Sequence, residues 1–307
     1  MKSPEGRSVL TASELVRRRR ASARAARRWR FAAAAGLLAC AAALLLVTRS
    51  ARTPAAPAAR RAAPSASAQR PRPTRRTRTT REATAIAATA RRMPYVSVAG
   101  HGRREIALTF DDGPGPYTRT IVRELRHRHA PATFFQVGSM IAEFPAAERA
   151  LIADTQVVLG DHTETHPMLP RLSASAQYQQ ISDEAGMQRL HGAPSPRRFR
   201  PPYGAIDRTT EQATRRLGLL DVLWSVDSQD YMQPGVAAIV SRVMAGAHPG
   251  AIVLLHDAGG TRTQTVQALP IIIRRLRKAH YRLVTIPRLL LDDRPSAHQP
   301  PRVVGAG

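Results

Sequence analysis

The sequence contains very little cysteine. Its single residue of this type, Cys40, excludes an intramolecular disulfide framework and a cysteine-based zinc cluster. The chain has 307 residues, of which 43% are hydrophobic, and this is enough to bury a core. Stability must therefore come from packing, and a bound metal is the one further source that the composition leaves open.

Acidic residues are also scarce. There are 22 Asp and Glu against 47 Lys and Arg, and the formal net charge is +25, which suggests a nucleic-acid partner. Most of this charge, however, lies in residues 1–30 and 49–92, while the rest of the chain is only mildly basic. Because the second basic segment is predicted to lie outside the cytoplasm, we expect no nucleic-acid partner.

Residues 31–47 form an apolar segment of seventeen residues, FAAAAGLLACAAALLLV, which follows a cluster of arginines. This length is the lower limit for a bilayer-spanning helix and exceeds the usual core of a signal peptide. We predict a signal anchor at 31–48, a basic cytoplasmic tail at 1–30 and an extracellular catalytic domain in a single-pass membrane protein, because the arginines are denser before the segment than after it. The alternatives are a cleaved signal peptide, which would secrete the protein, a buried helix, and a lipoprotein anchored at Cys40.

Residues 49–94 are rich in Ala, Pro, Arg, Thr and Ser and contain almost no bulky apolar side chain. Such a segment cannot bury enough apolar surface to offset the entropy lost on ordering, so we predict a disordered, extended linker. It would act as a tether, and it would also be attracted to anionic wall polymers or lipid headgroups. The catalytic domain is predicted at 95–292, followed by a disordered tail at 293–307.

Short apolar segments alternate with amphipathic ones through the predicted catalytic domain. The apolar segments predict strands at 105–110, 132–137, 156–159, 220–225, 251–255 and 282–285. Helical periodicity is found at 118–129, 143–154, 174–190, 209–217, 237–245 and 263–280. This alternation predicts an α/β fold with a parallel sheet or barrel.

Carboxylates and imidazoles follow the predicted strands. In a parallel α/β fold the carboxyl ends of the strands meet at one edge, where active sites lie. The residues found at these ends are Asp111, Asp112, His162, His166, Asp227, Asp230, His256 and Asp257. We therefore expect them to line one site.

Two of these groups are candidates for metal binding. Asp111 and Asp112 precede a Gly-Pro-Gly-Pro turn that would direct both acids into one cleft, although such a pair alone is more often a solvated turn. His162 and His166 are four residues apart, which directs two imidazoles at one ion if the segment is helical or turn-like. Two imidazoles and one carboxylate leave a zinc-like ion with an open coordination position.

Hydrolysis of an unactivated amide requires three chemical groups. A base takes a proton from water, an electrophile stabilises the oxyanion, and an acid protonates the leaving amine. Asp111, the metal and His256 could supply one each.

Five motifs occur in a fixed order: TFDDGP, HTETHPML, RPPYG, DSQDY and IVLLHD. In these motifs the chain resembles the NodB-like polysaccharide deacetylases, carbohydrate esterase family four, over roughly residues 100–290. The resemblance implies a distorted (β/α) barrel with an open groove for a glycan chain. It also implies a metal-dependent hydrolase.

The resemblance implies a role for each matching residue. Asp111 would be the general base and His256 the general acid, while Asp112, His162 and His166 would hold one divalent ion, which we expect to be zinc. In the remaining motifs, Arg200 would pair with Asp111 and keep it ionised and oriented, and Asp227 would be a second contact of Arg200. Asp230 would orient His256. The Tyr203 N–H would assist the metal at the oxyanion, and Leu254 would line the acetyl pocket. Tyr231 stands where the family commonly has tryptophan, which puts the groove wall and the substrate preference in doubt.

The expected activity is removal of N-acetyl groups from a polysaccharide, with N-acetylglucosamine in peptidoglycan as the first candidate substrate. N-acetylmuramic acid, chitin-type oligosaccharides and O-acetyl esters on xylan-type polysaccharides would suit the same groups. A second class of function is an inactive glycan-binding module, but no expected base, acid or ligand is missing. The predicted partners are an N-acetylated glycan and, through one helix, a membrane, and we expect a monomer.

Overall fold

A computed structural model describes residues 75–300, with side chains from Thr79 onward, and these residues form an α/β domain. Its strands are β1 (Tyr95–Val96), β2 (Glu105–Asp111), β3 (Ala132–Gln136), β4 (Val157–Asp161), β5 (Arg198–Phe199), β6 (Leu220–Val222), β7 (Val226–Asp227), β8 (Ile252–His256) and β9 (Arg282–Leu283). Its helices are α2 (Arg75–Arg92), α3 (Thr118–His127), α4 (Gly138–Glu143), α5 (Pro145–Ala153), α6 (Ala174–Leu190), α7 (Arg208–Leu217), α8 (Val236–Gly246), α9 (Thr263–Lys278) and α10 (Ile286–Asp292).

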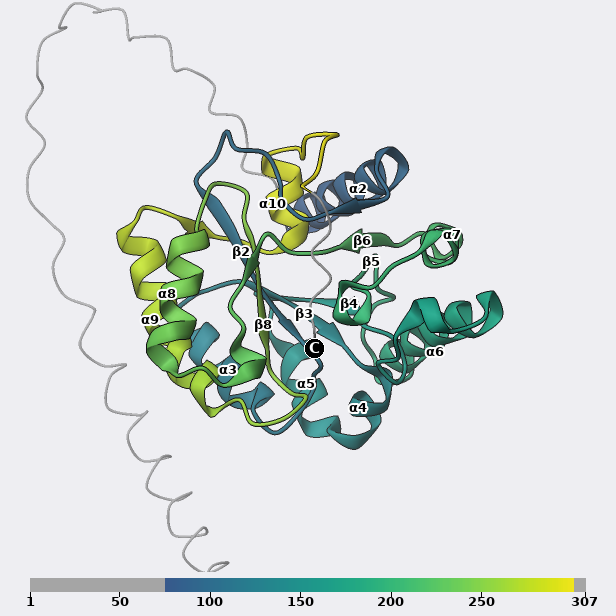
Figure 1. Ribbon diagram of the computed structural model, residues 1–307, viewed down its shortest axis with the longest axis horizontal. Coiled ribbons are helices and arrows are strands. Elements are labelled where there is room, and N and C mark those ends of the chain that lie inside the picture. The colour runs from purple at the N-terminus through teal and green to yellow at the C-terminus, as the bar shows by residue number, and fades with distance from the viewer. Residues whose placement is uncertain (1–74, 301–307) are drawn as a thin grey trace, which may run out of the picture. The chain divides into compact units, whose positions relative to one another are not determined.

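The strands form one curled sheet, a parallel half-barrel (Figure 1). The strand order is β1-β6-β5-β4-β3-β2-β8-β7, with β9 added beside β2, and all of these strand pairs are parallel. Connections between parallel strands must cross from one end of the sheet to the other, and crossover helices such as α3, α8 and α9 cover the outside of the curl. The predicted α/β class and parallel pairing are confirmed.

Along β2 and β8, side chains point alternately to the hydrophobic core on the outer face of the sheet and to the site on the inner face. Ile106, Leu108 and Phe110 of β2 lie in the larger hydrophobic cluster, together with the residues of α3, α8 and α9 that pack on the outer face of the sheet. Successive side chains of a strand point to opposite faces, so Ala107, Thr109 and Asp111 point to the inside of the curl. Residues 253 and 255 of β8 lie in the same outer cluster, which leaves Leu254 and His256 inside.

The predicted strands and helices are found within two residues of the expected ends, with one exception. Within the segment 220–225 only residues 220–222 form a strand, β6, and the separate strand β7 begins at Val226 and lies at a different place in the sheet. Some boundaries follow from local chemistry: Asp207 caps α7 by accepting a hydrogen bond of 2.8 Å from the Thr210 N–H, and Gly218 ends it with a φ of 70°. The strands β1 and β5 and the helices α2, α4 and α10 were not predicted.

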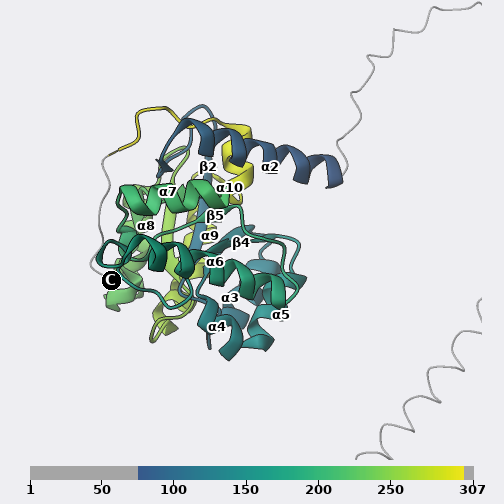
Figure 2. The ribbon, with the colours of Figure 1, turned by 90° about the vertical axis from the view of Figure 1, so that its right-hand side faces the viewer.

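The prediction of a disordered linker is wrong for the residues that form helix α2. Residues 75–92, expected to be disordered, form a helix that packs against α10 and β6 (Figures 1 and 2). Ile86 is 1% exposed and lies in the same hydrophobic cluster as Leu289 and Leu290 of α10. The few apolar residues of α2 are thus spaced to meet one neighbour, and the folded domain begins before the predicted residue 95.

The predicted C-terminal tail is corrected in the same way as far as residue 300. The Gln299 side-chain oxygen accepts hydrogen bonds from the Ser97 and Val98 N–H groups at 2.8 and 3.0 Å, and the Tyr95 hydroxyl donates to the Pro300 carbonyl at 2.9 Å. These contacts attach the segment after α10 to β1 and to the segment that follows it.

The remaining boundary predictions fall on residues 1–74 and 301–307, outside the described residues. They include the anchor at 31–48. Within residues 75–300, no helix combines the length and the apolar character that crossing a bilayer requires.

Candidate active site

A pocket of about 450 Å³ at the carboxyl ends of the strands contains most of the predicted site residues. Its lining includes Asp111, Asp112, His162, His166, Tyr203, Asp227, Tyr231, Leu254 and His256. The sheet register explains part of this arrangement, because Asp111 of β2 and His256 of β8 are paired neighbours with both side chains on the inside of the curl. A volume of this size is typical of small-molecule sites.

Asp112, His162 and His166 form the candidate metal centre. One ligand atom of each lies within 4.8 Å of the others. The Nε2 atoms of His162 and His166 are 3.6 and 3.3 Å from Asp112 Oδ1. Both histidines follow β4 in a turn, with left-handed φ values at Thr163 and His166, so the pair converges through a turn and not through a helix.

The side-chain chemistry of these three residues fits a divalent cation. The His162 Nδ1–H donates to the Arg200 carbonyl at 2.6 Å, which leaves Nε2 free to act as a ligand, an arrangement typical of metal-binding histidines. Burial and the neighbouring His162 lower the pKa of His166 to about 4, so its imidazole is neutral at neutral pH. Burial would lower the pKa of His162, yet the carboxylates of Asp111 and Asp112 raise it, which shows that this position favours a positive charge.

Asp111 is held by a buried arginine. Arg200 Nη1 donates to Asp111 Oδ1 at 2.8 Å and to Thr109 Oγ1 at 2.7 Å, so the expected pair of Arg200 and Asp111 is present. The rest of the guanidinium donates to the carbonyls of Val222 and Leu223. Arg200 is fully buried, and this set of bonds fixes one oxygen of Asp111 and leaves Oδ2 near the metal centre, 3.8 Å from His162 Nε2.

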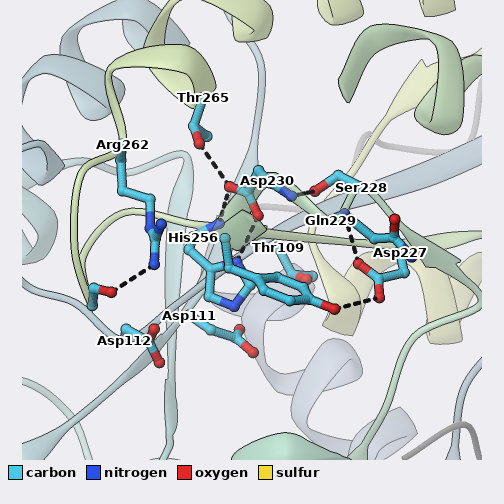
Figure 3. Close-up of polar contacts among 12 residues, drawn as sticks. Thr109, Asp111, Asp112, Asp227, Ser228, Gln229, Asp230, His256, Arg262 and Thr265 are labelled. Carbon is cyan, nitrogen blue, oxygen red and sulfur yellow. Dashed lines mark hydrogen bonds and ion pairs between the residues drawn. The ribbon is translucent and has the colours of Figure 1, made fainter. Parts of the chain in front are cut away.

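His256 is held by Asp230 (Figure 3). Its Nδ1–H donates to Asp230 Oδ1 at 2.7 Å, and its backbone N–H donates to Asp230 Oδ2 at 2.9 Å. Thr265 adds a hydrogen bond of 2.7 Å to the same carboxylate. Burial would lower the pKa of His256, but the charge of Asp230 and the hydrogen bond to it raise this pKa to about 9. The imidazole is therefore protonated at neutral pH, with Nε2–H available to the pocket.

The groove walls include the remaining predicted residues. The Tyr231 ring lies edge-on to His256 with 5.4 Å between ring centroids, and the Tyr203 ring lies 4.7 Å from that of His166. Leu254 is buried at the base of the pocket. The expected contact between Asp227 and Arg200 is not formed: Asp227 accepts from the Tyr231 hydroxyl at 3.4 Å and from the Gln229 N–H at 2.8 Å.

Several left-handed backbone conformations occur at the site. Among non-glycine residues, Asp112, His166 and Tyr203 have φ values of 73°, 58° and 61°. Such conformations cost free energy and persist where the surroundings enforce them, often at functional sites. Gly259 lies against Asp112 with a φ of 69°, and a Cβ atom at this glycine would be only 2.2 Å from Asp112 Oδ2. Glycine is therefore required there.

Several residues of the site were missed from the sequence. Thr265 supports Asp230, and Thr109 supports Arg200. Trp224 lines the pocket, and the buried Arg262 donates to the carbonyls of Ala258 and Gly259, both at 2.7 Å, which closes the loop next to Asp112 (Figure 3). Only the inward position of Thr109, two residues before Asp111 on the same strand, carried a signal that alternation could have revealed.

A fixed carboxylate, a protonated imidazole and a ligand set for one cation within one open pocket define an acid–base hydrolase. Comparison with known proteins specifies the class. Residues 99–222 match the family model described as polysaccharide deacetylase. A chitooligosaccharide deacetylase from Bradyrhizobium sp. is 36% identical over 201 residues, which cover 61% of this chain and 91% of that protein.

Two further matches support the same assignment to the polysaccharide deacetylases. A peptidoglycan-N-acetylglucosamine deacetylase from Bacillus cereus is 38% identical over 188 residues, 60% of this chain and 87% of that one. The crystal structure of a peptidoglycan N-acetylglucosamine deacetylase superposes with a TM-score of 0.63 at 28% identity and covers 69% of this chain and 98% of its own. The chain belongs to the polysaccharide deacetylase family, as its motifs predicted, and is an enzyme of this hydrolase class.

Proposed function

We propose that this enzyme removes the acetyl group from N-acetylglucosamine units of peptidoglycan and that it requires one divalent metal ion, zinc by preference. The observation that carries the proposal is the convergence of Asp111, His256 and the metal centre on one pocket. The first two supply a base and an acid, and the third supplies a place for the electrophile.

Asp111 acts as the general base. Its carboxylate takes a proton from water while the water oxygen forms a bond to the acetyl carbonyl carbon. Because Arg200 Nη1 holds Oδ1 at 2.8 Å, the carboxylate keeps one orientation and its free oxygen faces the pocket.

His256 acts as the general acid. It donates the Nε2 proton to the amine nitrogen as the bond between carbon and nitrogen breaks, which releases acetate and the free amino sugar. Asp230 keeps the imidazole charged before this step and in one tautomer during it. The Tyr203 backbone and Leu254 are assigned to the oxyanion and the acetyl methyl group, respectively.

Asp112, His162 and His166 would hold the metal ion. When bound, the ion supplies Lewis-acid polarisation of the carbonyl and of water. An imidazole that is already neutral at His166 and an Nε2 left free at His162 favour such binding.

The two relatives described above are a chitooligosaccharide deacetylase and a peptidoglycan-N-acetylglucosamine deacetylase, which supports N-acetylglucosamine as the sugar unit. Peptidoglycan is preferred because the basic segments of this chain would be attracted to an anionic wall.

The substrate is tested by measuring acetate release from purified peptidoglycan, chitooligosaccharides and acetylxylan side by side. The proposal expects the highest kcat/KM on peptidoglycan, and loss of about 10² or more in kcat in a folded Asp111→Asn variant. Faster release from acetylxylan would identify an O-acetyl esterase instead.

We also propose that the catalytic domain is held outside the cytoplasm by the segment 31–48, from its sequence alone. Membrane fractionation of cells that produce the full chain, followed by protease treatment of intact spheroplasts, tests this. The full chain should remain with membranes and its catalytic domain should be digested. Protection of the domain in intact spheroplasts would contradict the orientation.

A further inference from the structure

A second pocket, of about 400 Å³, lies between α2 and the C-terminal part of the domain, and it shares no residue with the active-site pocket. One wall is formed by α2 from Thr80 onward together with Met93, which directly follows it, and the other by the end of α10 and the segment after it. Figures 1 and 2 show α2 beside α10 in both views. We call this cavity the α2 pocket.

Side-chain size explains the α2 pocket. Ile86 and Met93 are buried and attach α2 to the domain. On the pocket side, however, α2 presents small residues such as Ala85 and Ala88, which cannot fill the space in front of Leu290 and Leu291. The result is an open groove with mostly apolar walls.

Three arginines also line the α2 pocket: Arg81, Arg92 and Arg294. All three are exposed, and none forms an ion pair within the described residues. The acidic residues at the end of α10 cannot neutralise them without losing other bonds, because Asp292 accepts from Arg282 and Asp293 accepts from the Arg103 N–H. The groove therefore combines apolar walls with free positive charge.

We propose that the α2 pocket binds an anionic phospholipid of the membrane, with one acyl chain against the apolar walls and the phosphate attracted by the guanidiniums that line the pocket. Guanidinium groups bind phosphate oxygens in a bidentate geometry, and an acyl chain gains by leaving water. A purely polar wall polymer would use the charges but not the apolar walls, which is why we favour a lipid. The inference does not depend on the proposed hydrolytic function.

The experiment uses the full chain reconstituted into nanodiscs that contain phosphatidylglycerol with a photoreactive group in one acyl chain. After illumination, labelled peptides are mapped by mass spectrometry, and unlabelled lipid is added as a competitor to obtain an apparent affinity. Labels should appear on α2 and α10, and phosphatidylcholine should compete poorly. The combined variant Arg81→Gln, Arg92→Gln and Arg294→Gln should weaken the apparent affinity by roughly 10²-fold, given the attraction of each arginine to anionic lipid.

Matched controls separate this site from general charge and size effects. The combined variant Arg119→Gln, Arg123→Gln and Arg149→Gln removes three exposed arginines from α3 and α5 and should leave the affinity within twofold, about the limit of additivity for distant sites. Ala88→Phe would fill the groove without a change in charge and should reduce labelling of α2, whereas Ala237→Phe on the exposed face of α8 should not. Thermal unfolding and acetate release establish that each variant is folded.

Two results would overturn the proposal. One is equal competition by phosphatidylcholine and phosphatidylglycerol, or equal affinity in the two triple variants. The other is labelling of α2 and α10 that appears only after deletion of residues 301–307, since the chain's own C-terminal residues would then be the occupant.

Discussion

Asp111 and His256 are neighbours in the sheet, yet their partners prepare them for opposite tasks. A guanidinium donates a hydrogen bond to Asp111 and fixes its orientation, and a carboxylate holds His256 as an imidazolium. Such a pair can accept a proton on one side of the substrate and donate one on the other. At the scale of single residues, the partners therefore determine function as much as the reacting groups do.

The pH dependence of the reaction should report on Asp230. The charge of this residue raises the pKa of His256 to about 9 against the effect of burial, so the acid stays protonated until the pH rises through that value. In Asp230→Asn the pKa should fall, and the alkaline limb of the kcat/KM profile should move to lower pH by about one unit or more. Asp227→Asn, which has no hydrogen bond to His256, should shift the limb less. An unchanged profile in Asp230→Asn would refute the assigned role.

Arg200 should be irreplaceable by lysine. Its planar group bonds four acceptors at once, which a single ammonium on a flexible stem cannot do. Arg200→Lys should lower kcat by about 10² or more, because a small misplacement of the base has a cost of this size. Arg198→Lys is the matched control. Arg198, on β5, is buried like Arg200, but its side chain donates to the Leu159 carbonyl and does not contact Asp111. Equal kcat in Arg200→Lys and the wild-type enzyme would show that charge alone is sufficient.

Among the secondary-structure elements, the main strands of the half-barrel were predictable from the sequence, whereas the helices α2 and α10 were not. The strand sequences that lead to Asp111 and His256 are apolar because both faces of these strands are covered. The ends of these strands could therefore be predicted from the sequence. By contrast, α2 has an arginine-rich composition that resembles a disordered segment. Its order depends on a few contacts with α10, which lies about 200 residues later in the sequence. Tertiary packing of this kind overrides local composition.

The same distinction applies within the site. Asp112, His162 and His166 could be found because spacing and strand ends indicate them. Thr265 and Arg262 could not, because they lie on or before α9 and act only through its position against Asp230 and the loop after β8. Supporting residues of this kind have no local pattern.

The contribution of α2 to the fold can be measured through Ile86. Its side chain is 1% exposed, so Ile86→Ala should reduce the free energy of unfolding by about 2–4 kcal/mol through lost burial and a new cavity. Leu190→Ala, at a position that is 76% exposed, should change it by less than about 0.5 kcal/mol. The measurement is chemical denaturation of both variants of the full chain. Equal stability of the two would mean that α2 does not belong to the folded domain, as the sequence alone had suggested.

At the scale of the whole molecule, chemistry and location are assigned to different parts of the chain. All catalytic groups lie between Asp111 and His256, on one half-barrel. We propose that the basic and apolar segments before residue 75 and the α2 pocket determine where the enzyme is held. Variants of the two parts should therefore separate kcat on small soluble substrates from action on intact wall.

We propose that one divalent ion, held by Asp112, His162 and His166, is required for release of acetate. The most direct test is a titration of metal-free enzyme with zinc, in which bound metal per chain and acetate released from a chitooligosaccharide are measured on the same samples. We expect no turnover without metal and full turnover at one ion per active site, whereas a folded His166→Ala variant should show neither stoichiometric metal binding nor turnover at the same zinc concentration. Undiminished acetate release by the metal-free enzyme would contradict it.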